Sequence, residues 1–289
     1  MPRKDGAMIG RRTLIASGLA AATLRPARAR QPSPRLRAMS FNVRLPIASD
    51  GDDYWPNRAR LFFDTVRAAD PDIVGTQELF KLQGDAWIAA LPGWAWFGID
   101  RRGGHADEHM GVFYRHDRLR VIDLGNFWLS ETPDVLASIS WGHPLPRMAT
   151  WGLFERIADG RRFHLFNTHF PYRAEDEAAR TRCAGVIADR IAAIAGPGPV
   201  VLTGDFNTGP DSEAHAVLTR DLADARGAAQ TVEGPEGTFH GFEGTPGKRI
   251  DWLLTRGFAV ERFATIDANT DGRYPSDHFP VLADLRFNG

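Results

Sequence analysis

Short apolar runs, rich in aromatic and β-branched residues, recur along the whole chain and predict strands. The first three lie at 37–43, 73–78 and 94–99. The run VVLTGDF at 200–206 follows a GPGP turn and has the nearly continuous apolar character of a buried strand. Further strands are predicted at 110–115, 119–129, 148–156, 162–169, 250–255 and 278–286.

Three segments show the 3.6-residue periodicity of amphipathic helices. The spacing predicts helices over 57–69, 79–91 and 175–195, with Asn57 as the N-cap of the first. On the longest, the apolar positions of one face are Ala179, Cys183, Val186, Ile187, Ile191 and Ile194. Runs of neighbouring strands interrupted by few helices predict one domain of stacked sheets with helices outside.

The composition is that of a folded globular protein. The chain has 289 residues, of which 43% are hydrophobic and 25% charged, so a disordered or fibrous protein is excluded. No apolar run reaches the ~20 residues that span a bilayer. The single cysteine, Cys183, excludes an internal disulfide and a cysteine-rich zinc site, and its place in a helical pattern predicts a buried thiol.

The N-terminus has the order of a twin-arginine (Tat) export signal. The pair Arg11 and Arg12 precedes an uncharged apolar stretch, and an A-x-A cleavage site ends at Ala29. A disordered basic tail on a cytoplasmic protein is the alternative. We expect residues 1–29 to be a signal peptide, residues 30–289 to be the mature domain, and the protein to be periplasmic or secreted.

Cleavage of this segment changes the charge of the protein. The whole chain has a formal net charge of −1, and loss of the first 29 residues removes six basic residues and one acidic residue, which leaves −6. Proteins that hold long nucleic acids usually have a basic excess, because they neutralise phosphates. The mature domain therefore lacks a broad electrostatic surface for nucleic acid, although a local basic groove stays possible.

Six predicted strands have a short polar block at or beside one end. The blocks are Ser40-Phe41-Asn42, Thr76-Gln77-Glu78, Asn167-Thr168-His169, Gly204-Asp205-Phe206-Asn207, Ile250-Asp251-Trp252 and Ser276-Asp277-His278. Buried polar groups are costly unless they are paired or bind an ion. Any one block has a simple structural explanation, but stacked strands place their ends on one rim. The six blocks together predict a shared site.

The residue types in these blocks favour a hard metal ion. Asn42, Glu78 and Asp277 offer oxygen ligands only, which suit Mg²⁺ or Mn²⁺. The nine histidines show no zinc-binding spacing such as H-E-x-x-H. We therefore expect Mg²⁺, or Mn²⁺, rather than zinc.

The blocks also resemble a known family. In order they read SFNVR (40–44), TQE (76–78), NTHF (167–170), GDFN (204–207), RIDWLL (249–254) and SDHFPV (276–281). Over about residues 37–286 the chain is similar to the endonuclease/exonuclease/phosphatase superfamily, with a deoxyribonuclease I-like fold. Residues 127–151 resemble uncharacterised bacterial members near the deadenylase-type exonucleases. The resemblance implies an α/β fold: a four-layer α/β/β/α sandwich of two stacked mixed sheets flanked by helices, with the active site at one edge.

The resemblance implies a metal site and a water site. Glu78, with Asn42 and Asp277, would hold the divalent cation that neutralises the phosphoryl oxygen and the leaving oxygen. Asp205 would position or activate the attacking water. For each residue the structural alternative is a hydrogen bond or an ion pair inside the core.

Four further residues would act on phosphate and water. Asn207 and His169 would donate hydrogen bonds to phosphate oxygens. His278 would orient or deprotonate the water or bind phosphate, with Asp251 behind it to fix its tautomer. Attack would be in line, without a covalent enzyme intermediate. A histidine satisfied within the core is the alternative for His169 and His278.

Residues beside these motifs are candidates for substrate contact. Arg147, Arg44 and Arg249 could bind a phosphate, with surface ion pairs as the alternative. Other residues near the motifs could line the pocket, although solvated surface is the favoured interpretation for Glu108, His109, Arg173, Thr238, Phe239 and Lys248. Aromatic residues could stack on a base or sugar, but their spacing favours core positions for Trp87, Trp94, Trp96 and Phe97.

Three functions agree with these features to different degrees. The first is Mg²⁺-dependent hydrolysis of phosphodiester bonds, as a nuclease of the 3′-5′ exonuclease type. The second is a phosphatase or phosphodiesterase acting on a small sugar, inositol or lipid headgroup phosphate, which suits the expected compartment and the net charge better. The third, an inactive protein that binds phosphorylated ligands, conflicts with the presence of all eight site residues. We expect a monomer without a membrane span.

Overall fold

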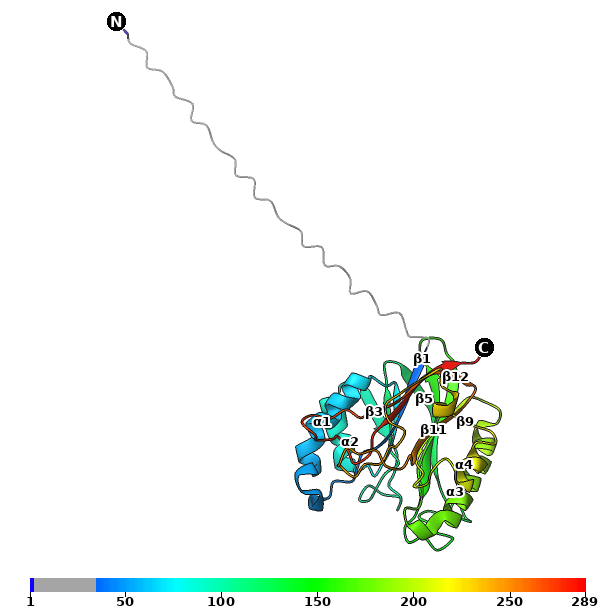
Figure 1. The fold of residues 1–289 in the computed structure, drawn as a ribbon. Coiled ribbons are helices and arrows are strands. Elements are labelled where there is room, and N and C mark those ends of the chain that lie inside the picture. The colour runs from blue at the N-terminus through cyan, green and yellow to red at the C-terminus, as the bar shows by residue number, and fades with distance from the viewer. Residues whose placement is uncertain (3–34) are drawn as a thin grey trace. The chain divides into compact units, whose positions relative to one another are not determined.

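The structure, a computed structural model, describes residues 1–2 and 35–289. Apart from its first two residues, the predicted signal segment 1–29 lies outside the described residues. Within 35–289, two stacked mixed sheets are flanked by helices (Figure 1), which confirms the predicted four-layer sandwich. Every helix in this described part of the chain is too short or too polar to span a bilayer.

The first sheet has seven strands in the order β10-β12-β13-β1-β2-β4-β3. Its central strand β1 is parallel to β2 and antiparallel to β13. The strands are β1 (Arg35–Asn42), β2 (Ile73–Gln77), β3 (Trp94–Phe97), β4 (Val112–Arg115), β10 (Thr231–Glu233), β12 (Phe258–Thr265) and β13 (Val281–Phe287). Because β1 and β2 are parallel, Asn42 and Gln77 end side by side at one edge of the sheet.

The second sheet has six strands in the order β5-β6-β7-β8-β11-β9. The strands are β5 (Leu119–Trp128), β6 (Met148–Arg156), β7 (Arg162–His169), β8 (Val200–Asp205), β9 (Ala223–Asp224) and β11 (Asp251–Arg256). Strand β8 is parallel to β7, with His169 opposite Asp205, and antiparallel to β11, with Asp251 opposite Asp205. This register places three predicted site residues in one row across the sheet.

Helices cover the outer face of each sheet (Figure 1). α1 (Trp55–Ala69) and α2 (Lys81–Ala90) pack on the first sheet, and α3 (Glu177–Ala195) and α4 (Glu213–Leu218) pack on the second. Short turns complete the chain at η1 (Ala48–Asp53), η2 (Ala174–Asp176) and α5 (Ala225–Ala228). Cys183, a residue of α3, is buried, as predicted.

Each predicted strand and helix is present, with small shifts at the ends. The prediction of Asn57 as an N-cap was wrong, because α1 already begins at Trp55 with Tyr54 as its cap. Pro56 explains the earlier start, since its fixed φ favours the first turn of a helix. Strand β12 and the short strands β9 and β10 were not predicted. The two-residue alternation of β12 is broken by a bulge between Val260 and Arg262, which hides the strand pattern.

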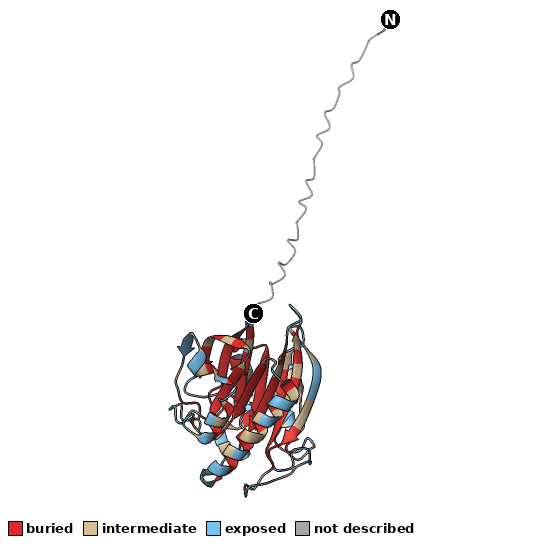
Figure 2. Cartoon of the chain, turned by 90° about the vertical axis from the view of Figure 1, so that its right-hand side faces the viewer, coloured by how far each residue is buried: buried red, intermediate tan, exposed pale blue. Residues whose placement is uncertain are grey.

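The layer between the sheets changes from apolar to polar along the strands. In β1, Met39 and Phe41 face the helices, while Leu36 and Ala38 face the second sheet. The period of two puts Asn42 on that same inner side. Figure 2 shows that buried residues fill the paired sheets while exposed ones lie on the outer helices and loops. The polar end of the layer is therefore enclosed between two sheets.

A hydrogen-bond network joins the sheets beneath this polar end. Asn167 Oδ1 accepts from Gln77 Nε2 at 2.7 Å and from Thr203 Oγ1 at 3.0 Å. Asn167 Nδ2 donates to the carbonyl oxygens of Thr76 and Gly111. Asn167 therefore links both sheets with its buried amide oxygen and nitrogen satisfied, which favours a single relative placement of the strand ends.

Gly75 in β2 leaves the space that this network occupies. A Cβ at that position would lie 2.1 Å from Thr203 Oγ1 and 2.5 Å from Asn167 Oδ1. We expect Gly75→Ala to lower the free energy of unfolding by about 1–3 kcal/mol, because the buried network has to shift. Urea denaturation measures this change.

Gly185→Ala in α3 is the matched control. A Cβ there meets no heavy atom within 4 Å, and alanine favours a helix, so the variant should gain about 0.5–1 kcal/mol. Equal stability of Gly75→Ala and the wild type would contradict the role assigned to this close approach.

Candidate active site

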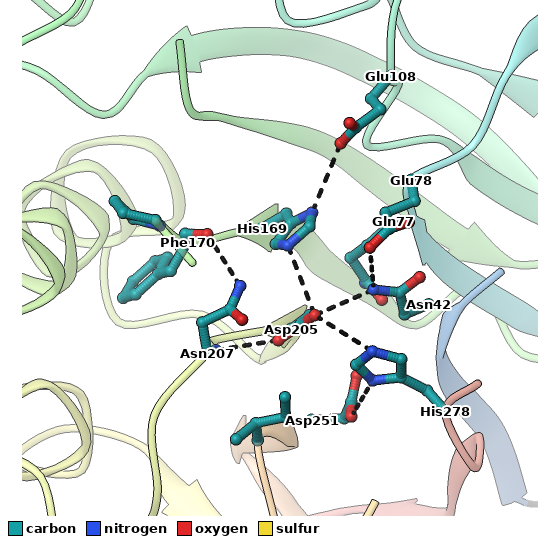
Figure 3. Close-up of polar contacts among 12 residues, drawn as sticks. Asn42, Gln77, Glu78, Glu108, His169, Phe170, Asp205, Asn207, Asp251 and His278 are labelled. Carbon is teal, nitrogen blue, oxygen red and sulfur yellow. Dashed lines mark hydrogen bonds and ion pairs between the residues drawn. The ribbon is translucent and has the colours of Figure 1, made fainter. Parts of the chain in front are cut away.

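Asp205, at the end of β8, lies at the centre of the polar rim (Figure 3). Its Oδ2 accepts a hydrogen bond from Asn42 Nδ2 at 3.0 Å and lies 3.5 Å from His169 Nε2 and 3.9 Å from His278 Nε2. Its Oδ1 accepts from the backbone N–H of Asn207 at 2.9 Å. One carboxylate therefore meets four of the predicted site residues.

His278 forms a buried pair with Asp251. The Nδ1 atom of His278 lies 2.9 Å from Asp251 Oδ2, and both side chains are buried. Burial opposes a charge on His278, but the surrounding carboxylates, Asp251 first, outweigh it and hold its pKa well above the usual value. The raised pKa favours the charged form of the ring, with Nδ1 facing Asp251 and Nε2 facing Asp205.

The environment of Asp205 has the opposite effect on its charge. Burial, followed by the charge of Asp251, raises the pKa of Asp205 to about 7. Burial and the positive charges of Arg147 and His278 hold the pKa of His169 well below its usual value, which favours its neutral form. The rim thus places a carboxylate of raised pKa between one histidine whose pKa is raised and one whose pKa is lowered.

The predicted metal ligands lie beside Asp205. Glu78 follows β2 with a left-handed φ of 58°, and its Oε1 accepts from Asn42 Nδ2 at 3.1 Å. Arg44 brings one guanidinium nitrogen to 3.9 Å from Glu78 Oε2 and 3.7 Å from Asp277 Oδ2. The two carboxylates therefore converge on one positively charged point.

The residues present fit a divalent cation. Burial raises the pKa of Asp277, and the buried Oδ1 of Asp251 has no hydrogen-bond partner. A cation would relieve both costs. Asp205, Asp251 and His278 also have ligand atoms within 4.8 Å of one another. Because Nδ1 of His278 is paired with Asp251, the carboxylate oxygens are the better ligands.

Asn42 and Asn207 form hydrogen bonds to protein groups, whereas a metal ion and phosphate oxygens were their expected partners. Asn42 Oδ1 accepts from the backbone N–H of Arg44 at 3.0 Å while its nitrogen joins Glu78 and Asp205, so its role as a metal ligand stays a prediction. Asn207 has a left-handed φ of 53° and donates to the carbonyl oxygen of Phe170 at 3.1 Å.

The three candidate arginines have different surroundings. Arg44 lies at the rim, where it also forms a two-point ion pair with Asp50. Arg147 is buried near the rim, only 3% exposed. Arg249 pairs with Asp224, which is the ion-pair alternative, and its contact with substrate stays a prediction.

Three of the residues expected on the solvated surface are buried instead. Glu108, His109 and Thr238 are buried, so the surface interpretation was wrong for them. Thr238 Oγ1 accepts from the backbone N–H of Asp251 at 3.1 Å and so holds the partner of His278. Phe239 is 41% exposed with its ring 5.0 Å from that of His278.

The aromatic candidates divide between core and half-buried positions. Trp87 and Trp94 are buried beneath the first sheet's helices, which confirms the core interpretation for them. Trp96 and Phe97 are partly buried and pack against core clusters.

A comparison with protein families agrees with this geometry. The model described as "Endonuclease/Exonuclease/phosphatase family" matches residues 39–278. The chain belongs to this family. Its members are phosphoric ester hydrolases that depend on a divalent metal ion, so the protein is a phosphoesterase.

Similar proteins cover most of this family domain. An endonuclease/exonuclease/phosphatase family protein from Bacteroides thetaiotaomicron is 32% identical, with a TM-score of 0.84, over 88% of this chain and 98% of that one. A mannosyl-6-phosphatase from the same organism is 32% identical, with a TM-score of 0.82, over 87% and 100%. An uncharacterised protein of Acanthamoeba polyphaga mimivirus is 27% identical over 162 residues, or 53% of this chain and 59% of that protein. The match thus spans less than two thirds of that relative.

Asp205→Asn tests the balance between burial and activity. The pKa of this carboxyl is raised in the folded protein, so its ionised form destabilises the metal-free fold. The free energy of unfolding therefore falls as pH rises toward about 7. In EDTA the variant should therefore unfold at a higher temperature than the wild type, with a larger difference at pH 8 than at pH 5. Its phosphoesterase activity should fall by about 100-fold or more. A lower melting temperature at pH 8 would contradict this account.

Proposed function

We propose that this protein is a metal-dependent phosphatase that hydrolyses the phosphate monoester of a small sugar. The observation that carries the proposal is the 32% identity to a mannosyl-6-phosphatase over the whole of that protein. The rim geometry supports the chemistry, because it combines carboxylates for a cation with polar groups for phosphate and water. The net charge of −6 expected for the mature domain also suits a small ligand better than a long nucleic acid.

A divalent cation, Mg²⁺ or Mn²⁺, would be held by Glu78 and Asp277, with Asn42 as a further candidate. When bound, it supplies positive charge to the phosphoryl oxygen and the leaving oxygen. The hard oxygen donors of these side chains support Mg²⁺ or Mn²⁺ over a softer ion.

The side chains around Asp205 would perform the transfer to water. Asp205 Oδ2 takes the proton of the attacking water, and its pKa near neutrality suits a general base. The water oxygen bonds to phosphorus as the bond to the sugar oxygen breaks, and that oxygen takes a proton from solvent. His278, held by Asp251, donates from Nε2 to a phosphate oxygen, and the neutral His169 and Asn207 orient the other oxygens.

The 3′-5′ exonuclease activity expected from the resemblance stays a prediction. One assay that compares monoesters with diesters and nucleic acids distinguishes it from the phosphatase activity. Purified protein with Mg²⁺ or Mn²⁺ should release phosphate from hexose 6-phosphates and p-nitrophenyl phosphate. It should act much more slowly on bis-p-nitrophenyl phosphate and single-stranded RNA or DNA. EDTA should abolish turnover. Activity confined to the diesters and nucleic acids would overturn the proposal.

Asp251→Asn should lower kcat by about 100-fold or more, because His278 loses the carboxylate that holds its proton and orientation. Asp267→Asn makes the same change on an exposed loop and is the matched control. Equal kcat values for the two variants would remove support for the role of His278.

Export of the protein is a second part of the proposal and rests on the sequence of its N-terminus. The combined change Arg11→Lys and Arg12→Lys should retain an uncleaved precursor in the cytoplasm, since the twin-arginine pair is the recognised feature. The wild type should appear outside the cytoplasm with a mature N-terminus after Ala29. Arg3→Lys with Arg25→Lys is the control. Equal processing of both double variants would contradict export by this route.

A further inference from the structure

The loop between β3 and β4 is pinned by one carboxylate. Asp100 Oδ1 accepts from the backbone N–H groups of Arg102 and Gly104 at 2.8 and 2.9 Å. Its Oδ2 accepts from those of Ala106 and Asp107 at 2.7 and 2.9 Å. Four backbone bonds to a buried side chain hold the loop in one conformation, so the residue that follows, Glu108, has a defined position.

Arg101 holds only one oxygen of Glu108. One guanidinium nitrogen of Arg101 lies 3.0 Å from Glu108 Oε1, and another lies 2.9 Å from Asp107 Oδ1. Glu108 Oε2 is buried, has no hydrogen-bond partner, and lies 3.9 Å from Nδ1 of the catalytic candidate His169 (Figure 3). That Nδ1 atom also has no hydrogen-bond partner. The free oxygen of Glu108 thus flanks the reacting groups.

Arg147 presents free donors in the same region. It is 3% exposed, and its Nε and one terminal nitrogen have no hydrogen-bond partner among the described residues. Its charge is felt by both Glu108 and His169. On its other side the guanidinium lies 5.8 Å from the ring of Tyr172, which is 56% exposed. Arg147 therefore lies between an exposed ring and the buried rim.

Free polar atoms are concentrated here within the described part of the chain. Fifteen buried side-chain atoms of the described residues have no hydrogen-bond partner, and one of these is the Arg101 nitrogen that forms the ion pair with Glu108. Five of the others lie in this region: Arg101 Nε, Glu108 Oε2, Arg147 Nε and one of its terminal nitrogens, and His169 Nδ1. Each such atom costs about 1–3 kcal/mol if it stays unsatisfied. The neighbouring Asn167 shows the usual alternative, because both ends of its amide are satisfied. A group of unsatisfied donors and acceptors beside a catalytic rim indicates a place where a ligand completes the bonds.

We propose that Glu108 and Arg147 bind hydroxyl groups of the sugar whose phosphate is hydrolysed. The proposal rests on the proposed function. A hydroxyl group can donate to Glu108 Oε2 and accept from Arg147, so it matches an acceptor and a donor at once. A second phosphate would match Arg147 but would be repelled by Glu108. The exposed ring of Tyr172 offers an apolar face for the carbon side of a sugar.

The test compares two monoesters in the presence of Mg²⁺ or Mn²⁺. Mannose 6-phosphate has hydroxyl groups on its leaving group, and p-nitrophenyl phosphate has none. For Glu108→Gln, the ratio of their kcat/KM values should fall by about 10- to 100-fold against the wild type, the loss expected for a hydrogen bond to a charged group. Arg147→Lys should shift the ratio in the same direction, because a point charge replaces the planar donor.

Glu213→Gln on α4 makes the same substitution on an exposed residue outside the site and should keep the wild-type ratio. If Glu108→Gln lowers both kcat/KM values equally, Glu108 acts on the transfer or the fold, and the sugar contact is refuted. If Glu108→Gln does not fold, Tyr172→Ala takes its place, and an unchanged ratio there refutes the subsite. Failure of the wild type to hydrolyse either monoester would instead refute the proposed function.

Discussion

The burial of the Asp205 carboxylate between two sheets is the constraint on which the site depends. A charged group at this position has little water to stabilise it, so its charge must be balanced by neighbouring side chains. Asn42, His169 and His278 reach it from β1, from β7 and from the segment before β13. Partners from both sheets therefore meet at one carboxylate, and the raised pKa of Asp205 shows that the balance is incomplete. A group in that state is suited to proton transfer and to a nearby cation.

The fold supports this arrangement from below. The amide of Asn167 joins the sheets through Gln77 and Thr203, and Gly75 provides the space for it. On β7 and β8 these contacts lie two residues before His169 and Asp205, where the layer changes from apolar to polar. The amide of Asn167, with its oxygen and nitrogen both bonded, joins the two sheets. The rim above it keeps polar atoms without hydrogen-bond partners, which are available to substrate, water and metal.

The residues around Asp205 differ in their proposed role from those that flank His169. The groups that we propose to act on phosphorus gather around Asp205, whereas Glu108 lies at the other ring nitrogen of His169. The charge of Arg147 acts on the same histidine. Because the family's chemistry is shared, differences between substrates have to come from such flanking residues. The loop pinned by Asp100 and the buried Arg147 lie outside the catalytic row, so we expect relatives that act on other phosphoesters to differ there.

The sequence by itself indicated most of the strands, the main helices, the family and the eight residues that meet at the rim, because period-two patterns and polar blocks at strand ends are local signals. It also indicated a metal with oxygen ligands. Tertiary structure decided which partners those residues have. The sequence favoured a surface position for Glu108, but the folded loop buries this residue beside the rim. Arg249 forms an ion pair with Asp224, a partner that its sequence context did not indicate. Burial, pairing and pKa depend on groups distant in the chain, and no local pattern encodes which of them meet.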